Sequence, residues 1–209
     1  MADSGQDTQD ARQEAQDARV EALAATRVLR LADRAAMAAF ADAVGRAVRP
    51  GDVLVLTGNL GAGKTTFTQF LARSLDVRGR VSSPTFVIAR EHPPRGGGPG
   101  LVHVDAYRLG GPDEFDDLGL DAALDESVTV VEWGRGMAES LGDHLDVEIL
   151  REDEEAAAAD DPDNLDPTAL APDSLDPEDD ASDDEPRTVV VTAHGASWAG
   201  RLAKLHPES

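Results

Sequence analysis

The sequence predicts an α/β protein with a mixed sheet of about seven strands that is flanked by helices. Short apolar runs of strand length recur along the chain, and stretches with helical spacing of apolar residues separate several of them. One of these runs, residues 53–57, leads into a glycine-rich loop and then into a helical pattern over residues 67–75. A strand, a glycine loop and a helix in this order form an anion-binding unit.

The loop reads Gly58-Asn59-Leu60-Gly61-Ala62-Gly63-Lys64-Thr65-Thr66 and fits the P-loop pattern G-x-x-x-x-G-K-[ST]. Its glycines allow backbone N–H groups to turn inward around phosphate oxygens, and the helix N-terminus favours the same negative charge. Lys64 would bridge the terminal phosphates, and Thr65 would offer its hydroxyl to Mg²⁺. The loop therefore predicts a P-loop NTPase-like fold, with every residue of the loop a candidate for cofactor binding.

The composition limits the class of protein. A chain of 209 residues is long enough for one domain with a substantial core. It contains no cysteine, which excludes a disulfide framework and a cysteine-ligated metal site. The formal net charge is −22, but residues 152–186 carry sixteen Asp or Glu and no Lys, Arg or His. Without that segment the net charge is −6, so the rest of the chain is only mildly acidic.

Two segments contain too little apolar surface to repay the entropy of ordering them. Residues 1–22 are predicted to be a disordered N-terminal tail, and residues 152–186 a disordered acidic insertion. Residues 23–209 are otherwise predicted to form a single P-loop ATPase domain that this insertion interrupts. The sequence shows no signal peptide and no run of about 20 apolar residues, so we expect a cytoplasmic protein without membrane association.

The elements before the loop follow from local patterns. Residues 27–31 are predicted to be the first strand, and Asp33 is a predicted N-cap. The helix that follows has apolar residues at steps of three and four, namely Met37, Phe40, Val44 and Val48. It is predicted to end at the Arg-Pro-Gly sequence of residues 49–51.

After the P-loop helix, residues 86–91 and 101–105 are predicted strands. The proline- and glycine-rich connection between them is too short for a parallel crossover, so an antiparallel pair is expected. Asp113 is predicted to cap a helix that carries Phe115 and Leu118. Further helical turns are expected at two places, residues 121–124 and 137–141.

Three more predicted strands complete the sheet, at residues 128–133, 145–150 and 188–193. The last two are predicted to pair antiparallel, with the acidic insertion at the tip of their connection, where a long loop costs little closure entropy. Trp198, Leu202 and Leu205 predict a final amphipathic helix.

Two predicted strands end in a carboxylate, Asp105 and Glu132. Ligands of open α/β sheets bind at the carboxyl ends of the strands, so both acids can meet the P-loop there. In P-loop enzymes the Mg²⁺ that accompanies ATP is held by the loop Ser/Thr and by a strand-end acid. Thr65 is the predicted first ligand. Asp105 and Glu132 compete for the second role, and the other acid would orient or deprotonate the attacking water.

Three further residues are weighed for function. Thr85 is a candidate for contacting the γ-phosphate or Mg²⁺, and the alternative is a turn hydroxyl bonded to its own backbone. His103 lies inside an apolar strand and is interpreted as a core histidine with satisfied hydrogen bonds rather than as a base. Trp133 either covers the site, anchors a partner or packs as a core aromatic.

Several motifs are absent from the sequence. There is no Asn-Lys-x-Asp, so a guanine-specific pocket is unsupported. No arginine-rich lid of a small-molecule kinase follows the P-loop, and no signature of a stacking or hexameric ATPase is present. A small-molecule kinase with a P-loop and a non-catalytic nucleotide-dependent adaptor remain as alternatives to an ATPase.

Four motifs together, in this order and at this spacing, resemble the TsaE family. They are the P-loop with Phe67, then Ser83-Pro84-Thr85-Phe86, then His103-Val104-Asp105-Ala106-Tyr107-Arg108-Leu109, and then Val131-Glu132-Trp133. The resemblance covers roughly residues 27–150 and 187–203. Four ordered motifs are a more specific signal than a P-loop alone. The acidic insertion and the N-terminal tail depart from the family pattern.

The resemblance implies a small Mg²⁺-dependent ATPase, weak alone, that binds the TsaD and TsaB proteins. These partners modify the adenosine beside the anticodon of tRNA with a threonylcarbamoyl group, so the chain would meet tRNA indirectly, through the complex. It further implies that Lys64 and Thr65 hold phosphate and Mg²⁺, that Glu132 is a Mg²⁺ ligand, and that Asp105 activates water or acts as a second metal acid. Thr85 would sense the γ-phosphate, and Arg187 matches a family arginine near the nucleotide.

Overall fold

The computed structural model describes residues 25–82, 89–119, 125–137, 142–151, 185–198, 200–202 and 205. The predicted tail, Thr85, the predicted turn at residues 121–124 and most of the turn at 137–141 lie outside these residues. So does almost all of the acidic insertion. The predicted division into tail, domain and insertion therefore stays a prediction.

A seven-stranded mixed sheet forms the centre of the described fold, in the order β1-β7-β6-β2-β5-β4-β3. The strands are β1 (Ala25–Leu31), β2 (Val53–Thr57), β3 (Ala89–His92), β4 (Gly100–Asp105), β5 (Ser127–Glu132), β6 (His144–Arg151) and β7 (Arg187–His194). The four central strands β6, β2, β5 and β4 are parallel, and β1, β7 and β3 pair antiparallel at the two sides. The predicted sheet and its two antiparallel pairs, β3–β4 and β6–β7, are confirmed.

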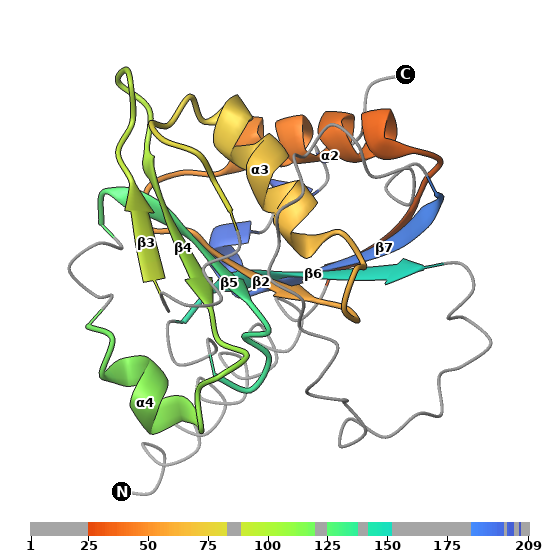
Figure 1. The fold of residues 1–209 in the computed structure, drawn as a ribbon. Helices are drawn as coiled ribbons and strands as arrows, with labels where there is room; N and C mark the ends of the chain where they lie inside the picture. Colours follow the sequence, from red (N-terminus) through yellow and green to blue (C-terminus); the bar gives the residue numbers. More distant parts are fainter. Residues whose placement is uncertain are drawn as a thin grey trace, which may run out of the picture.

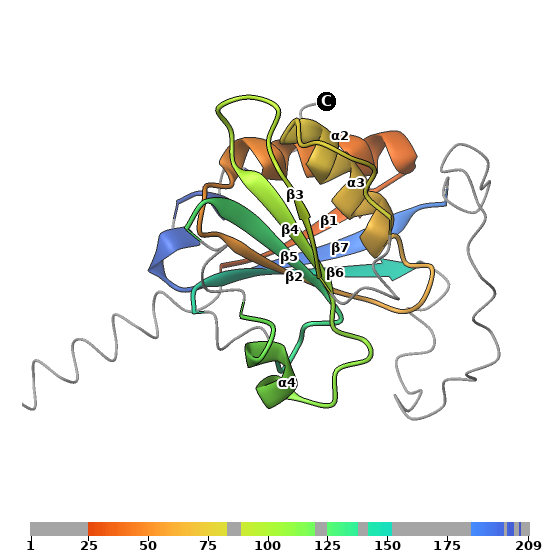
Figure 2. The same ribbon diagram turned by 60° about the vertical axis from the view of Figure 1, so that its left-hand side comes forward.

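Two helices cover one face of the sheet and a short helix lies on the other (Figure 1). They are α2 (Arg34–Ala47) and α3 (Lys64–Ser74) on the first face and α4 (Pro112–Asp116) on the second. Figure 2 shows the same two-sided arrangement after rotation. As expected from the sequence, Asp33 is the N-cap of α2, where its carboxylate accepts the N–H of Ala36 at 2.8 Å.

The sheet separates two hydrophobic clusters because successive side chains of a strand point to opposite faces. Leu54 and Leu56 of β2 join the larger cluster under α2 and α3, where the rings of Phe40 and Phe67 lie 5.5 Å apart. Val53 and Val55 join the smaller cluster with Phe115 of α4. Strand β2 is buried on both faces, so its carboxyl end is a firmly held position from which the P-loop starts.

Two predicted helices differ in the structure. Helix α4 begins at Pro112, with Gly111 as its N-cap, so Asp113 lies in the first turn and is not the cap. A proline is favoured at the first helical position because that residue needs no N–H partner. Near the C-terminus, the described residues form a 3₁₀ turn at Ala196–Trp198 in place of the predicted amphipathic helix. Gly200 has a φ of 75°, a left-handed conformation that breaks the helix between the apolar positions.

Among the described residues, no helix combines the length and the apolar character needed to cross a bilayer.

Candidate active site at the strand ends

The P-loop leaves the carboxyl end of β2 and enters α3 through three glycines with positive φ angles. Gly58 has a φ of 131°, and a Cβ at this position would lie 2.2 Å from the carbonyl oxygen of Ile149 on β6. Only glycine fits there, because the neighbouring backbone approaches too closely for a side chain. Gly61 and Gly63 have φ angles of 76° and 107°, and Gly63 is the N-cap of α3. The backbone therefore curls around the N-terminus of α3, as an anion cradle requires.

The other loop residues divide into exposed and packed positions. Asn59 and Leu60 are exposed, and Leu60 has an exposed fraction of 61%. Ala62 is buried and belongs to the large hydrophobic cluster, and Thr66 is partly buried in the first turn of α3. The buried Ala62 therefore fixes one end of the loop, whereas the end at Leu60 is open to solvent.

Lys64 is buried, with an exposed fraction of 5%, and its ammonium group lies at the centre of the loop. It donates hydrogen bonds to the carbonyl oxygens of Gly58 at 2.7 Å and Asn59 at 2.9 Å. The same nitrogen lies 3.8 Å from the centre of the Trp133 ring, close enough for a cation–π interaction. The predicted phosphate-binding lysine is thus held under the loop.

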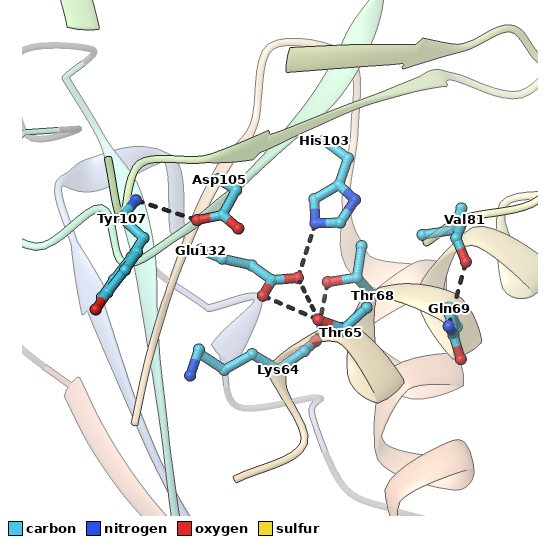
Figure 3. A network of polar contacts seen from close by, with 9 residues as sticks. All are labelled: Lys64, Thr65, Thr68, Gln69, Val81, His103, Asp105, Tyr107 and Glu132. Carbon is cyan, nitrogen blue, oxygen red and sulfur yellow. Dashed lines mark hydrogen bonds and ion pairs between the residues drawn. The ribbon is translucent and has the colours of Figure 1, made fainter. Parts of the chain in front are cut away.

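Glu132 joins the P-loop helix to the sheet. The Thr65 hydroxyl lies 3.1 Å from both carboxylate oxygens of Glu132, and His103 Nε2 lies 2.8 Å from its Oε1 (Figure 3). Glu132 and His103 have exposed fractions of 3% and 0%. Among the described residues, none forms a hydrogen bond with the buried His103 Nδ1, which favours the tautomer with its proton on Nε2, donated to the carboxylate. A hydroxyl and a carboxylate are thereby fixed side by side at the start of α3.

Asp105 lies beside Glu132 at the same level of the sheet. The two residues are direct partners in the register of β4 and β5, and both side chains lie on the α3 side of the sheet (Figure 3). Asp105 is buried, and its Oδ1 accepts the N–H of Tyr107 at 3.1 Å. Since this backbone bond fixes the carboxyl group, the two strand-end acids form a stationary pair next to Thr65.

Trp133 follows Glu132 with a φ of 60°, a rare conformation for a residue with a large side chain. Its N–H donates to the carbonyl of Leu56 at 2.9 Å, and its ring lies 5.4 Å from the ring of Tyr107. The interpretation of Trp133 as a core aromatic is wrong, because its ring is only half-buried and contacts the Lys64 ammonium.

Arg187, at the start of β7, supports the loop from the other side. Its Nε donates to the carbonyl oxygen of Ala62 at 3.2 Å, and the side chain is buried. Arg187 and Ala62 are 125 positions apart in the sequence, so no local pattern predicts this contact. The arginine holds the loop through its backbone.

The structure brings together the P-loop residues and both strand-end acids, while Thr85 lies outside the described residues. The interpretation of His103 needs correction. It is buried as expected, but it contacts the site carboxylate directly and only one ring nitrogen is hydrogen-bonded. The alternation of a β-strand could have revealed this, because His103 lies two residues before Asp105 and so points to the same face.

Comparisons with known proteins identify similar chains. A family model described as "Threonylcarbamoyl adenosine biosynthesis protein TsaE" matches residues 31–159. The tRNA threonylcarbamoyladenosine biosynthesis protein TsaE of Streptomyces coelicolor is 48% identical over 154 residues, which cover 73% of this chain and 86% of that protein. The protein of the same name from Bacillus subtilis is 47% identical over 94 residues, 44% of this chain and 57% of its own length.

A solved structure is also similar. The crystal structure of Bacillus subtilis YdiB superimposes with a TM-score of 0.58 at 26% sequence identity, covering 88% of this chain and 95% of that chain. The residues that the family model matches contain the P-loop, Asp105 and Glu132.

Proposed function

Because this chain belongs to the TsaE family, we propose that its strand-end site binds ATP with Mg²⁺ and hydrolyses it in tRNA threonylcarbamoyladenosine biosynthesis. The contact between the Thr65 hydroxyl and the Glu132 carboxylate is the single observation that carries the proposal. It pairs the loop hydroxyl with a strand-end acid, which is the ligand pair that holds Mg²⁺ in P-loop enzymes.

The residues present fit these cofactors. Positive φ angles at Gly58, Gly61 and Gly63 shape a backbone cradle at a helix N-terminus, where an anion is favoured. Thr65 and Glu132 supply oxygen ligands, which Mg²⁺ prefers. When bound, ATP supplies the phosphoanhydride that is cleaved, and Mg²⁺ neutralises charge on its phosphate oxygens.

The chain's own residues then have separate tasks. Lys64, which donates to the carbonyls of Gly58 and Asn59, would donate to phosphate oxygens when ATP is bound, because these charged oxygens are stronger acceptors. Glu132 and Thr65 would hold Mg²⁺, and His103 keeps Glu132 in position. Asp105, fixed by the N–H of Tyr107, orients the attacking water and accepts its proton.

Trp133 shields the Lys64 side of the site from solvent. Thr85 is proposed as a further contact of the γ-phosphate.

We further propose that turnover by the isolated chain is weak and that the TsaD and TsaB proteins are its partners. In that assembly the chain drives or resets the cycle that modifies tRNA, and it meets tRNA through the complex. This part of the proposal rests on family membership.

The test combines binding and turnover. Phosphate release is measured for the wild type and for Lys64→Ala, each alone and with TsaD and TsaB, and a pull-down with both partners is performed with and without ATP. We expect release that requires no added acceptor, rises with the partners and is lost in Lys64→Ala together with nucleotide binding. ADP formation that requires a small-molecule acceptor and yields no free phosphate would instead identify a kinase, and ATP binding without turnover even with partners would identify an adaptor.

A further inference from the structure

A second cluster of chemistry-bearing side chains lies at the opposite end of the sheet from the P-loop. His144 and Asp146 belong to β6, and His194 ends β7. His144 is level with Val53, the first residue of β2, whereas the P-loop follows Thr57, about 13 Å further along the strand. Each of the three side chains offers one potential metal-ligand atom. In the part of the chain that the structure describes, these three atoms all lie within 4.8 Å of one another.

The sheet register brings the three side chains to one face. His144 is the direct antiparallel partner of His194, and Asp146 lies two residues further along β6. Leu145 and Val147 point into the cluster under α2 and α3, so His144 and Asp146 point to the opposite face. The two imidazole rings are stacked, with centroids 4.4 Å apart and an angle of 15° between their planes. His194 is 33% exposed, which gives solvent a way in.

The hydrogen bonds around the cluster leave two acceptors facing each other. Nδ1 of His144 lies 2.8 Å from the carbonyl oxygen of Gly142, and because a carbonyl only accepts, Nδ1 carries the proton. Nε2 of His144 is therefore the ring nitrogen that remains to bind a ligand, and it faces Asp146 Oδ1 at 3.7 Å, too far for a hydrogen bond. Oδ1 is buried and has no hydrogen-bond partner among the described residues. An unpartnered carboxylate oxygen opposite an imidazole lone pair is the arrangement that a cation between them would satisfy.

We propose that His144, Asp146 and His194 bind one divalent transition-metal ion of the zinc type. Two imidazole nitrogens and a carboxylate oxygen form a donor set that suits Zn²⁺, and the carbonyl behind His144 is the second-shell partner that metal-binding histidines commonly use. Bonds of about 2.0–2.2 Å place the ligand atoms of a tetrahedral ion about 3.4 Å apart. Nε2 of His194 lies 3.1 Å from Asp146 Oδ2, to which it is hydrogen-bonded, and Nε2 of His144 lies 3.7 Å from Asp146 Oδ1, so each histidine faces a different oxygen of the carboxylate at about this spacing.

The ion would join β6 to β7 at the end of their ladder, with solvent completing its coordination. Since the ligands come from two strands of the folded sheet, the ion binds the folded chain and stabilises it by mass action.

The probe is Co²⁺ added to the metal-free full chain without nucleotide, in excess Mg²⁺ so that the many surface carboxylates are occupied. We expect the visible absorption of tetrahedral cobalt, saturation at one ion per chain, and displacement by Zn²⁺. His194→Ala and the isosteric Asp146→Asn are expected to weaken Co²⁺ affinity at least about tenfold, because even second-shell changes cost that much. Zn²⁺ is expected to raise the melting temperature of the wild type and not that of these variants.

Two controls separate this site from other places where a metal could bind. His92→Asn removes a buried histidine from β3, and Glu132→Gln removes the carboxylate of the proposed Mg²⁺ centre; both are expected to keep the wild-type cobalt spectrum. Circular dichroism of the metal-free variants establishes that they are folded. The proposal is overturned if the wild type shows no tetrahedral spectrum, or if folded Asp146→Asn and His194→Ala bind Co²⁺ as the wild type does.

Discussion

A buried carboxylate lies at each end of strand β2, and different partners stabilise the negative charges of the two. At its start, Asp52 receives both guanidinium nitrogens of Arg201, at 2.5 and 2.8 Å, and the N–H of Arg49 at 2.7 Å. At its far end, Glu132 on the neighbouring strand receives a hydroxyl and an imidazole. Among the described residues, no arginine or lysine forms an ion pair with Glu132.

Burial alone does not distinguish a structural carboxylate from a functional one. Asp52 and Glu132 have exposed fractions of 7% and 3%, so they are about equally withdrawn from water. The first is neutralised by a bidentate arginine and needs nothing more. Glu132 has polar partners but, within the part of the chain that the structure describes, no permanent cation, as expected of a carboxylate that is to hold a metal ion. We therefore expect substitutions at the first end to lower stability and substitutions at the second end to lower turnover.

The largest expected effect is at the structural end. Arg201→Ala leaves Asp52 buried and without its cation, so we expect the free energy of unfolding to fall by about 3–5 kcal/mol. Arg46→Ala is the matched control, because Arg46 pairs with Asp42 on the exposed surface of α2 and such pairs contribute about 0.3–0.5 kcal/mol. Urea unfolding of both variants measures the difference. Equal losses would contradict the assignment of Asp52 and Arg201 as a structural pair.

At the other end, Glu132→Gln is expected to act on turnover. Removing the charge while keeping the shape should lower phosphate release by about 10²–10³-fold, the scale of one lost electrostatic contact to the transition state. Nucleotide binding is retained, and the free energy of unfolding does not fall, because a buried charge without a cation is costly to keep.

Glu148→Gln provides the control for this variant. Glu148 lies on β6 close to the site, and its carboxylate forms an ion pair with Arg135 at 3.5 Å. Its substitution should leave phosphate release unchanged. Wild-type turnover in Glu132→Gln would remove Glu132 from the proposed metal centre.

His103 holds Glu132 as Arg201 holds Asp52, but without a permanent charge. His103→Leu should therefore raise the Mg²⁺ concentration for half-maximal phosphate release by about 10–100-fold, the usual cost of losing a second-shell partner. His103→Gln should restore much of this affinity, because the glutamine amide can donate to the carboxylate from about the position of Nε2. Nucleotide binding without Mg²⁺ should be the same in all three proteins. If His103→Leu and His103→Gln show the same Mg²⁺ dependence, His103 has a packing role only.

Much of the site could be predicted because its chemistry lies in short local patterns. The P-loop is contiguous, and Asp105 and Glu132 each follow an apolar strand directly. Parallel strands present their carboxyl ends at one edge, so topology alone brings the two acids together. The same reasoning gave the strands and the Asp33 cap, since both depend on residues a few positions apart.

The parts that could not be predicted depend on contacts between distant segments. Arg187 reaches Ala62 across the acidic insertion, and the left-handed backbone of Trp133 follows from packing that no local propensity encodes. The prediction of a C-terminal helix is wrong because Gly200, which has a left-handed conformation, lies between the apolar positions and interrupts the helix. His103 was placed correctly inside a strand, but its partner comes from the neighbouring strand.

His92 offers the smallest effect and the finest test of how burial acts on these side chains. Like His103, it is buried, and Nδ1 is hydrogen-bonded to the carbonyl of Arg78 at 3.2 Å. Nε2 has no hydrogen-bond partner among the residues that the structure describes. Its partner is a neutral carbonyl, whereas that of His103 is a carboxylate. Burial lowers the pKa of His92 below its ordinary value of 6.5, because the imidazolium loses its hydration.

The sign of the pH dependence follows. Above pH 6.5 His92 is neutral in both states and contributes no pH dependence. As the pH falls below 6.5, the unfolded chain takes up a proton that the folded chain does not, so stability is lost, by at most about 1.4 kcal/mol per pH unit. His92→Asn keeps a donor for the Arg78 carbonyl and does not titrate. Urea unfolding from pH 7.5 to 5 should therefore show a shallower loss in the variant than in the wild type. Parallel curves would mean that His92 is protonated in the folded protein and that its burial is incomplete.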